Sequence, residues 1–345
     1  MEDGNRKLYP LRFVDEGADV SWGHVCYHIA DLGFKDSMIV NGWFSGNTLS
    51  ELMGTYMERV TGDDAFEYYG LQFPLLVKVM DVSRWQPLQV NAGDRTAEER
   101  YDSFGKTALW YILESGEDST LCLGFNREVE AASFYERCLE GRPGEVLNYI
   151  HPSKGDVFVI QPGTVYAAGP GLKVLEIAEC SELSFNLCDL DQEAGPSEDL
   201  LLEEAFDIID FHAYVPVPPP SREGEGPQRL LARYPEFTVT ELDLKDPLRI
   251  YSDQPGSFAA YHCLKGSASV QVPDAEPCHL DEGQTVLVPS ENHDFILAPA
   301  APGTVLLEAM VEKRTVVDSY TGSEGSQGQA PETETTPHSH VRTWN

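Results

Sequence analysis

The stretch GDVFVIQPGTVYAAGPG, residues 155–171, constrains the fold of this chain more than any other segment. Gly155 precedes an apolar run, Pro162-Gly163 interrupts it, and Thr164 to Ala168 continues with strand-forming residues. A glycine, a short apolar strand and a Pro-Gly turn are typical of two adjacent strands at the mouth of a small β-barrel. The stretch therefore predicts a β-barrel that carries Tyr166 on the second of these strands.

Other short apolar segments, separated by turns that contain Gly or Pro, extend this pattern along the chain. A hairpin is expected where residues 108–115 and 120–125 flank the turn Gly116-Glu117-Asp118. Residues 1–45 are expected to be irregular. Alternating short strands and turns are typical of a β-barrel or sandwich. Further strands are expected at residues 72–81, 86–90, 172–178 and 183–190.

Residues 237–311 form a second segment rich in strand signals. Here Gly283 to Pro289 repeats the order of glycine, apolar strand and proline that runs from Gly155 to Pro162. A repeat of this kind indicates an internal duplication that gives two barrels of one type.

Helical and linker signals suggest how the chain is divided. Apolar residues at helical spacing predict helices over residues 47–60 and 127–139, both in the first half. A Pro-rich segment is typical of an extended linker, and an aperiodic Ser/Thr/Gly/Glu-rich segment is typical of a flexible tail. The predicted division is an N-terminal domain at 1–214, a linker at 215–228, a C-terminal domain at 229–313 and a flexible tail at 314–345.

The chain is strongly acidic, with a formal net charge of −33 over 345 residues. Its field repels nucleic acids and anionic membranes, so neither is an expected partner. No apolar run reaches membrane-spanning length and the first residues lack the apolar core of a signal peptide, which predicts a cytoplasmic protein. The 7 Cys residues form no CxxC pair and are expected to be buried, reduced thiols rather than zinc ligands or nucleophiles.

Several sequence blocks occur together in the order typical of one enzyme family. They are Trp22-Gly23, NGWFSGNTLSEL (41–52), FPLLVKVMDV (73–82), LQVNAGD (88–94), GKTALWYILES (105–115), GDVFVIQPGTVYAAG (155–169) and LEIAECSELSFNLCDLD (175–191). Through these blocks the chain resembles the type I mannose-6-phosphate isomerases, which are zinc-dependent bicupins. The resemblance implies a mainly β fold of two cupin-type barrels or jelly rolls, with a helical insertion in the first.

The resemblance also identifies the positions at which the family holds zinc. Family members use a Gln, two His and a Glu, and this chain has Gln89, Asn91, Ala108 and Tyr166 at those positions. Zinc prefers imidazole nitrogen, thiolate or carboxylate oxygen, whereas Asn91 offers a neutral amide and Ala108 offers no ligand. Tyr166 would have to ionise from an ordinary pKa of about 10. No metal is therefore expected there, and no cofactor is expected, although the family uses zinc.

The family chemistry depends on that metal. The reaction interconverts an aldose and a ketose through an ene-diolate, and the metal stabilises the developing negative charge. A family Arg implicated in proton transfer or substrate positioning corresponds to Asn186 here. Lys106 and Asn186 thus mark family catalytic positions, but no intact catalytic set is expected.

Two lysines remain at positions that match family lysines facing the active site, Lys78 and Lys106. Lys78 lies in an apolar strand, where a charge is costly unless it reaches water, a carboxylate or a bound anion. Glu176 is a candidate partner, and both a structural Lys78–Glu176 pair and a retained anion-binding role are open. The residues expected to contact a sugar or sugar phosphate are Lys78, Gln89, Lys106, Tyr166 and Glu176.

Three functions are open at this point. The leading interpretation is a homologue that has lost most zinc ligands and binds a sugar or sugar phosphate as a non-catalytic regulatory protein. The alternatives are an active aldose–ketose isomerase with a rebuilt site and a scaffolding protein with a vestigial pocket; the sequence identifies no protein partner. His24, His28 and His151 lie outside the strands that match the family and are not expected to replace the lost ligands.

Overall fold

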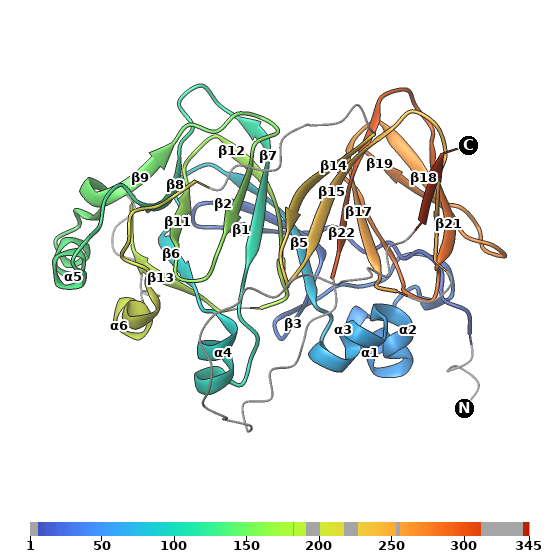
Figure 1. Ribbon diagram of the computed structural model, residues 1–345, viewed down its shortest axis with the longest axis horizontal. Coiled ribbons are helices and arrows are strands. Elements are labelled where there is room, and N and C mark those ends of the chain that lie inside the picture. The colour runs from blue at the N-terminus through green and yellow to red at the C-terminus, as the bar shows by residue number, and fades with distance from the viewer. Residues whose placement is uncertain are drawn as a thin grey trace, which may run out of the picture.

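The computed structural model describes residues 6–181, 183–190, 201–216, 227–252, 256–311 and 341–344. Within these residues the fold is mainly β and consists of two sandwiches that lie side by side (Figure 1). Most of the predicted linker and most of the predicted tail, residues 217–226 and 312–340, lie outside the described residues. No helix in the described part of the chain is long and apolar enough to span a membrane.

The N-terminal sandwich packs a 6-stranded sheet against a 5-stranded sheet. Side chains from both sheets form one core between them, with Met80 and Trp110 from the first and Leu123 and Tyr166 from the second. The 6-stranded sheet has the order β1 (Glu16–Val20), β2 (Gly23–Ile29), β5 (Leu75–Val82), β12 (Leu172–Glu179), β7 (Ala108–Ser115), β10 (Val157–Ile160). The 5-stranded sheet has the order β13 (Ser184–Cys188), β6 (Leu88–Asn91), β11 (Val165–Ala168), β8 (Leu121–Phe125), β9 (Leu147–Ile150).

The C-terminal sandwich repeats this arrangement with two 5-stranded sheets. One sheet has the order β14 (Gln228–Arg233), β15 (Thr238–Leu244), β22 (Thr304–Met310), β17 (Ala259–Lys265), β20 (Thr285–Val288). The other has the order β19 (Cys278–Asp281), β18 (Ser267–Gln271), β21 (Asp294–Pro299), β16 (Leu248–Tyr251), β23 (Val341–Trp344). Strand β20 pairs with β17 as β10 pairs with β7. This equivalence of pairing supports the internal duplication that the repeated Gly-to-Pro segments indicate.

The helices pack against the sheets from outside, where some contribute to the apolar core shared by the two sandwiches and others cover the outer face of the 5-stranded N-terminal sheet. Thr48 begins α1 with a capping box, because its side chain accepts from the backbone of Glu51 while the Glu51 side chain accepts from the backbone of Thr48. The helices are α1 (Leu49–Tyr56), α2 (Glu58–Thr61), α3 (Asp63–Tyr69), α4 (Asp94–Tyr101), α5 (Ala131–Leu139) and α6 (Leu202–Ala205), with 3-10 turns at Gly42–Phe44, Pro143–Val146 and Phe206–Ile208. The predicted helices at 47–60 and 127–139 are therefore present, as α1 with α2 and as α5.

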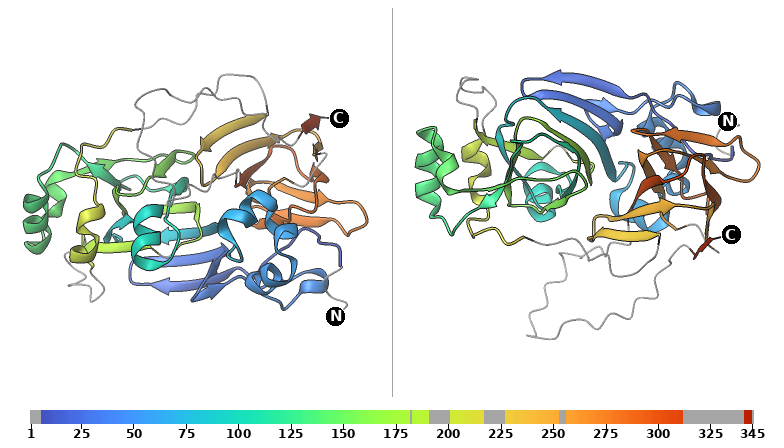
Figure 2. Two further views of the ribbon diagram at one scale, coloured as in Figure 1. Left: turned by 60° about the horizontal axis from the view of Figure 1, so that its bottom comes forward. Right: turned by 90° about the horizontal axis from the view of Figure 1, so that it is seen from above.

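The two sandwiches lie side by side in further views as well (Figure 2), and they share a buried apolar core. Strand β5 turns Leu76, Lys78 and Met80 toward its own sandwich interior, while Leu75 and Val77 belong to a second core that includes residues of the C-terminal sheet. Side chains contributed to this second core by the C-terminal sheet are Val239, Ala260, Leu287, Leu307 and Ala309. Because the interface is continuous apolar core, the six-stranded sheet is buried on much of both faces.

Three expectations about the strands are wrong. Strands β7 and β8 do not form a hairpin, because β7 pairs with β12 and β10 while β8 pairs with β11 and β9 in the facing sheet. Strands β10 and β11 are likewise not paired neighbours, and Pro162-Gly163 carries the chain from one sheet to the other. Residues 1–45 were expected to be irregular, but the described part, residues 6–45, contains β1 and β2 together with the short strands β3 (Asp31–Leu32) and β4 (Lys35–Asp36).

The tail is also more ordered at its end than its composition predicts, because β23 pairs with β16 as an antiparallel strand. Composition misses this strand because four residues are too short a segment to show a clear period.

Gly163 shows why the crossing between the sheets needs a glycine. Its φ of +84° lies in the left-handed region, which residues with a Cβ adopt only at a cost. In this conformation its N–H donates to the Asn91 carbonyl at 3.0 Å and its own carbonyl accepts from the N–H of Asp210 at 2.9 Å. The turn thereby ties the end of β6 to the crossing segment.

We expect Gly62→Ala to destabilise the protein by about 2–3 kcal/mol, because the position combines two conflicts. Gly62 has a φ of +91°, and a Cβ there would collide with the backbone carbonyl of Gly256 in the C-terminal half. The matched control is Gly54→Ala in the middle of α1, where an added Cβ meets nothing within 4 Å. That control should be neutral or stabilising by up to about 1 kcal/mol, as measured by urea unfolding. Equal stability of the two variants would contradict the prediction.

Candidate functional site

The interior of the N-terminal sandwich contains a row of polar side chains in the six-stranded sheet. Glu176 on β12 lies directly opposite Lys78 on β5 and directly opposite Trp110 on β7. In an antiparallel sheet, residues paired in this way place their side chains on the same face. The strand register alone therefore brings a carboxylate, an ammonium and an indole together inside the sandwich.

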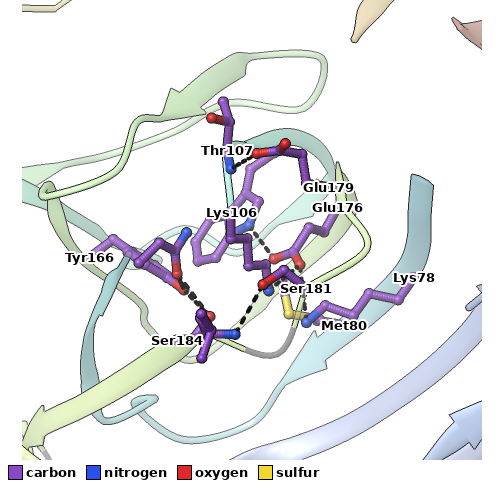
Figure 3. Close-up of polar contacts among 12 residues, drawn as sticks. Lys78, Met80, Lys106, Thr107, Tyr166, Glu176, Glu179, Ser181 and Ser184 are labelled. Carbon is purple, nitrogen blue, oxygen red and sulfur yellow. Dashed lines mark hydrogen bonds and ion pairs between the residues drawn. The ribbon is translucent and has the colours of Figure 1, made fainter. Parts of the chain in front are cut away.

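These side chains, with Lys106 just before β7, form a lysine–glutamate cluster (Figure 3). Glu176 Oε1 lies 3.1 Å from Lys78 Nζ and 3.2 Å from Lys106 Nζ. Glu176 Oε2 accepts from Trp110 Nε1 at 2.8 Å. Glu176 and Lys106 are buried, whereas the Lys78 side chain keeps 16% of its exposure. Among the described residues, Glu176 is the carboxylate that pairs with both lysines, so the cluster carries one excess positive charge.

Electrostatics in the cluster favour the charged form of Glu176. Burial alone would raise the pKa of Glu176, but the ammonium groups of Lys106 and Lys78 overcome it and lower the pKa to about 2. Burial also opposes the charged form of Lys106, yet Glu176 and Tyr166 raise its pKa. For Lys78, burial together with the nearby Lys106 outweighs the attraction of Glu176 and lowers the pKa. The charged form of Lys78 is therefore the one in this cluster that a further anion would stabilise most.

The facing sheet contributes a second group of polar side chains, the amide–hydroxyl cluster of Asn91, Tyr166 and Ser184. Asn91 Oδ1 accepts from Tyr166 Oη at 2.8 Å and from Ser184 Oγ at 2.8 Å. Asn91 is fully buried, and its Nδ2 group has no hydrogen-bond partner among the described residues. Because hydroxyl donors occupy its oxygen, the group that Asn91 has left to offer is an N–H donor.

Gln89 lies next to this cluster and pairs across the strands with both Tyr166 and Asn186. Its Nε2 donates to Asn186 Oδ1 at 2.7 Å. Gln89 and Asn186 are half-buried, whereas Tyr166 and Asn91 are fully buried. The site is therefore closed at the Tyr166 end and retains polar groups nearer the surface.

Tyr166 joins the two clusters. Its ring packs edge-on against Trp110, with ring centroids 5.4 Å apart. Burial raises the pKa of Tyr166 above its ordinary value, so the hydroxyl remains protonated and acts as a donor. Ala108, which lies on β7 two residues before Trp110, is buried and contributes no polar atom. Tyr166 and Ala108 thus belong to one buried cluster, in which Ala108 has no ligand atom to offer.

The structure brings together all the residues singled out from the sequence. Lys78, Lys106 and Glu176 meet in one cluster, and the facing sheet supplies Gln89, Asn91, Tyr166 and Asn186. Sequence reasoning missed the contacts made by Trp110 and Ser184. The strand register would have revealed both contacts, because Trp110 lies directly opposite Glu176 and Ser184 lies directly opposite Asn91.

Comparisons with known proteins identify relatives of one kind. The mannose-6-phosphate isomerase ManA of Bacillus subtilis is 30% identical over 190 residues, which cover 54% of this chain and 58% of the relative. The mannose-6-phosphate isomerase of Streptococcus mutans is 24% identical over 257 residues, which cover 74% of this chain and 78% of the relative. The chain is a homologue of the mannose-6-phosphate isomerases. It spans less than two thirds of the Bacillus subtilis ManA sequence, and no family model matches it.

Solved structures of mannose-6-phosphate isomerases share the fold. The crystal structure of the Bacillus subtilis enzyme superimposes with a TM-score of 0.73 at 22% identity, covering 87% of this chain and 99% of that chain. A putative mannosephosphate isomerase from Archaeoglobus fulgidus gives a TM-score of 0.69 at 18% identity, covering 89% and 99%. A mannose 6-phosphate isomerase bound with zinc and yttrium gives a TM-score of 0.66 at 13% identity, covering 88% and 99%. The chain therefore has the cupin fold of the mannose-6-phosphate isomerases, as the sequence resemblance implies.

Proposed function

We propose that this chain is a non-catalytic homologue of the mannose-6-phosphate isomerases that binds a sugar phosphate and acts as a sensor or regulatory protein. The observation that carries the proposal is the amide–hydroxyl cluster at the family's metal position. There, Tyr166 and Ser184 donate to the Asn91 side-chain oxygen that a cation would otherwise need. The two hydroxyl hydrogens are used within the cluster, and among the described residues the donor left over is Asn91 Nδ2, which suits a hydrogen-bond acceptor of a ligand better than a metal.

The residues at that position do not fit zinc. Asn91 presents an unpartnered N–H donor, Ala108 presents a methyl group, and Tyr166 presents a protonated hydroxyl. Gln89 alone cannot hold a divalent transition metal, since neither an anionic ligand nor an imidazole accompanies it. We therefore propose no step that passes through a metal here.

Without a bound metal, this chain would lack the main source of transition-state stabilisation in the family reaction. Metal ions acting as Lewis acids contribute several kcal/mol, and a loss of that size lowers a rate by a factor on the order of thousands. Asn186, which stands where the family has an Arg, is already hydrogen-bonded to Gln89. A neutral amide in that contact cannot replace a guanidinium in proton transfer or charge stabilisation.

The ligand class follows from the lysine–glutamate cluster. Two buried ammonium groups share one carboxylate, which leaves an excess positive charge within a chain whose overall charge is −33. The partly exposed Lys78 lies at the edge of the cluster and gains from an added anion. A phosphate would satisfy this charge, and sugar hydroxyls would satisfy Gln89, Asn186 and the free N–H of Asn91. Lys78, Gln89, Lys106, Tyr166 and Glu176 are the proposed ligand-binding residues.

Thermal unfolding with mannose 6-phosphate, with the corresponding ketose phosphate, and with inorganic phosphate alone tests the binding proposal. A ligand at about 100 times its Kd should stabilise the protein by about 2.7 kcal/mol and raise Tm by several degrees. Lys78→Met should abolish the shift. Lys173→Met is the matched control, because Lys173 lies on the outer face of the same sheet in an exposed pair with Glu114 at 3.5 Å. If no sugar phosphate raises Tm, the scaffolding function is favoured instead.

A coupled isomerase assay with added zinc, manganese or cobalt tests the non-catalytic part of the proposal. We expect no turnover above that of the metal ions alone. Metal-dependent isomerisation that is lost in Lys106→Met would contradict the proposal and favour an enzyme with a rebuilt site.

A further inference from the structure

A cleft of about 890 Å³ lies between the two sandwiches, on the side of the six-stranded sheet that faces away from the sugar-phosphate site. Val79 lines this cleft, whereas its chain neighbour Lys78 belongs to the interior cluster, so the two sites occupy opposite faces of β5. The N-terminal sandwich contributes residues of β2, β5 and β7, and the C-terminal sandwich contributes residues of β17 and β22. The cleft is thus separate from the position at which the family holds its metal.

One wall of this cleft carries three side chains of types that ligate metals. Asp15, Cys26 and His28 each offer one ligand atom, and these atoms all lie within 4.8 Å of one another. Cys26 and His28 are two residues apart on β2, and both line the cleft. Val25, the residue before Cys26, points to the opposite face and packs into the sandwich interior. The pairing of Glu16 with Tyr27 brings Asp15, the residue before β1, alongside His28. The register of β1 and β2 therefore assembles the three donors.

The hydrogen bonding of His28 supports its binding of a metal ion. The side chain is only 5% exposed, and its Nδ1 atom lies 3.2 Å from Asp15 Oδ1. Even so, Nδ1 has no hydrogen bond of acceptable geometry among the described residues. A buried ring nitrogen without a well-directed partner is uncommon, and binding of an ion is one of the standard explanations.

The C-terminal sandwich closes the far side of the site. His262 on β17 packs edge-on against His28, with ring centroids 5.6 Å apart. Its Nδ1 atom is 2.9 Å from Thr285 Oγ1, which fixes the orientation of the ring. The His262 ring thus packs against the His28 ring from the C-terminal sandwich.

We propose that Asp15, Cys26 and His28 form a zinc-type metal site whose open coordination position faces the cleft between the two sandwiches. A carboxylate, a thiolate and an imidazole are ligands that zinc accepts, and three protein ligands leave one position of a tetrahedron for water or another small ligand. The proposal departs from the expectation that the Cys residues are not zinc ligands, and it gives His28 a role other than replacing the lost family ligands. It does not depend on the proposed sugar-phosphate function.

Cobalt(II) titration of the full chain, first stripped of metal with a chelator, tests the proposal. One equivalent should produce the intense visible bands of tetrahedral cobalt and a near-ultraviolet thiolate-to-cobalt charge-transfer band, both displaced by zinc. Cys26→Ser should abolish the charge-transfer band. Cys26→Ser and Asp15→Asn should each weaken zinc binding by at least about 100-fold, more than the loss of an outer partner causes.

Matched controls test whether other cysteines or histidines near the cleft bind the metal instead. Cys263→Ser removes a different thiol that lines the same cleft, and His24→Ala removes an exposed histidine of β2 that contacts Asp19 at 2.7 Å. Both variants should keep the charge-transfer band and the affinity. Cys26 and Asp15 are not fully buried, so their variants should fold, as circular dichroism would verify. Absence of one-to-one binding, or a charge-transfer band that survives Cys26→Ser, would overturn the proposal.

Discussion

Replacement of Glu176 by Gln should lower the free energy of unfolding by about 3–5 kcal/mol, because it leaves two buried ammonium groups without their shared anion. Lys78 and Lys106 lie 3.1 Å and 3.2 Å from the Glu176 carboxylate, and each would then repel the other without compensation. Trp110 would also lose the charged acceptor of its indole N–H. Urea unfolding at neutral pH measures the effect.

A surface pair on the same strand supplies the control. Lys173 on β12 pairs with Glu114 on β7 at 3.5 Å, and both side chains are exposed. Glu114→Gln should therefore change stability by less than about 1 kcal/mol. If Glu176→Gln is no more destabilising than Glu114→Gln, the lysine–glutamate cluster does not have the energetic role assigned to it.

The same carboxylate predicts how stability depends on pH. The pKa of Glu176 falls from 4.5 to about 2 on folding, so the folded state favours the ionised form. A lowered pKa gives stability that is present above pH 4.5 and is lost as the pH falls from there toward about 2. Unfolding free energies measured across this range should fall less steeply for Glu176→Gln than for the unsubstituted chain.

The second large effect is a gain of metal binding. Asn91→His, Ala108→Glu and Tyr166→His together restore two imidazoles and a carboxylate beside Gln89, which are ligands that hold zinc well. We expect this triple variant to bind zinc at least about 1,000-fold more tightly at this position than the parent does. Removal of the Tyr166 ring also frees volume in the buried cluster to which Ala108 belongs, which helps to accommodate a longer side chain at position 108.

Both the parent and the triple variant should carry Cys26→Ser in this experiment, so that metal bound in the cleft does not contribute. Isothermal titration with zinc then compares the two directly. Tight zinc binding by the Cys26→Ser parent itself would show that Asn91, Ala108 and Tyr166 do not prevent the interior site from holding a metal, and would remove the main support for a non-catalytic function.

Much of the fold was accessible from the sequence, because Gly-bounded apolar runs and the family-like blocks mark most strands of the first sandwich. Strand partners were not accessible in the same way. A Pro-Gly turn looks the same whether it joins paired strands or carries the chain between facing sheets, and Pro162-Gly163 does the second. Pairing depends on hydrogen bonds to strands far away in sequence, such as β12 for β7, which a local pattern does not reveal.

The N-terminal strands were missed for a different reason. All five residues of β1 are exposed, so this edge strand has no buried face and shows no alternation of apolar and polar residues. Strand β2 mixes Val25 with Cys26 and His28, whose polar character hides the fact that they face a cleft between the sandwiches. The cluster of Asp15, Cys26 and His28 was not visible in the sequence, because Asp15 becomes a neighbour of the other two only through the register of β1 with β2.

The interior site was predicted more completely. Lys78 in an apolar strand required a partner, and Glu176 is that partner. The hydrogen bonds of Tyr166 and Ser184 to Asn91 were not predictable, because the choice between donor and acceptor depends on how three side chains are oriented in space. With this choice, the group that Asn91 has left over among the described residues is an N–H donor rather than an oxygen acceptor.

Strand β23 has a practical consequence for handling the protein. It pairs with β16 at one edge of the C-terminal sandwich, as β13 pairs with β6 in the N-terminal one. A shortened version that stops near residue 311 would leave the backbone N–H and C=O groups of β16 without this neighbour. An uncovered edge of this kind recruits strands from other molecules, so such a version should self-associate, and a tag is better attached at the N-terminus.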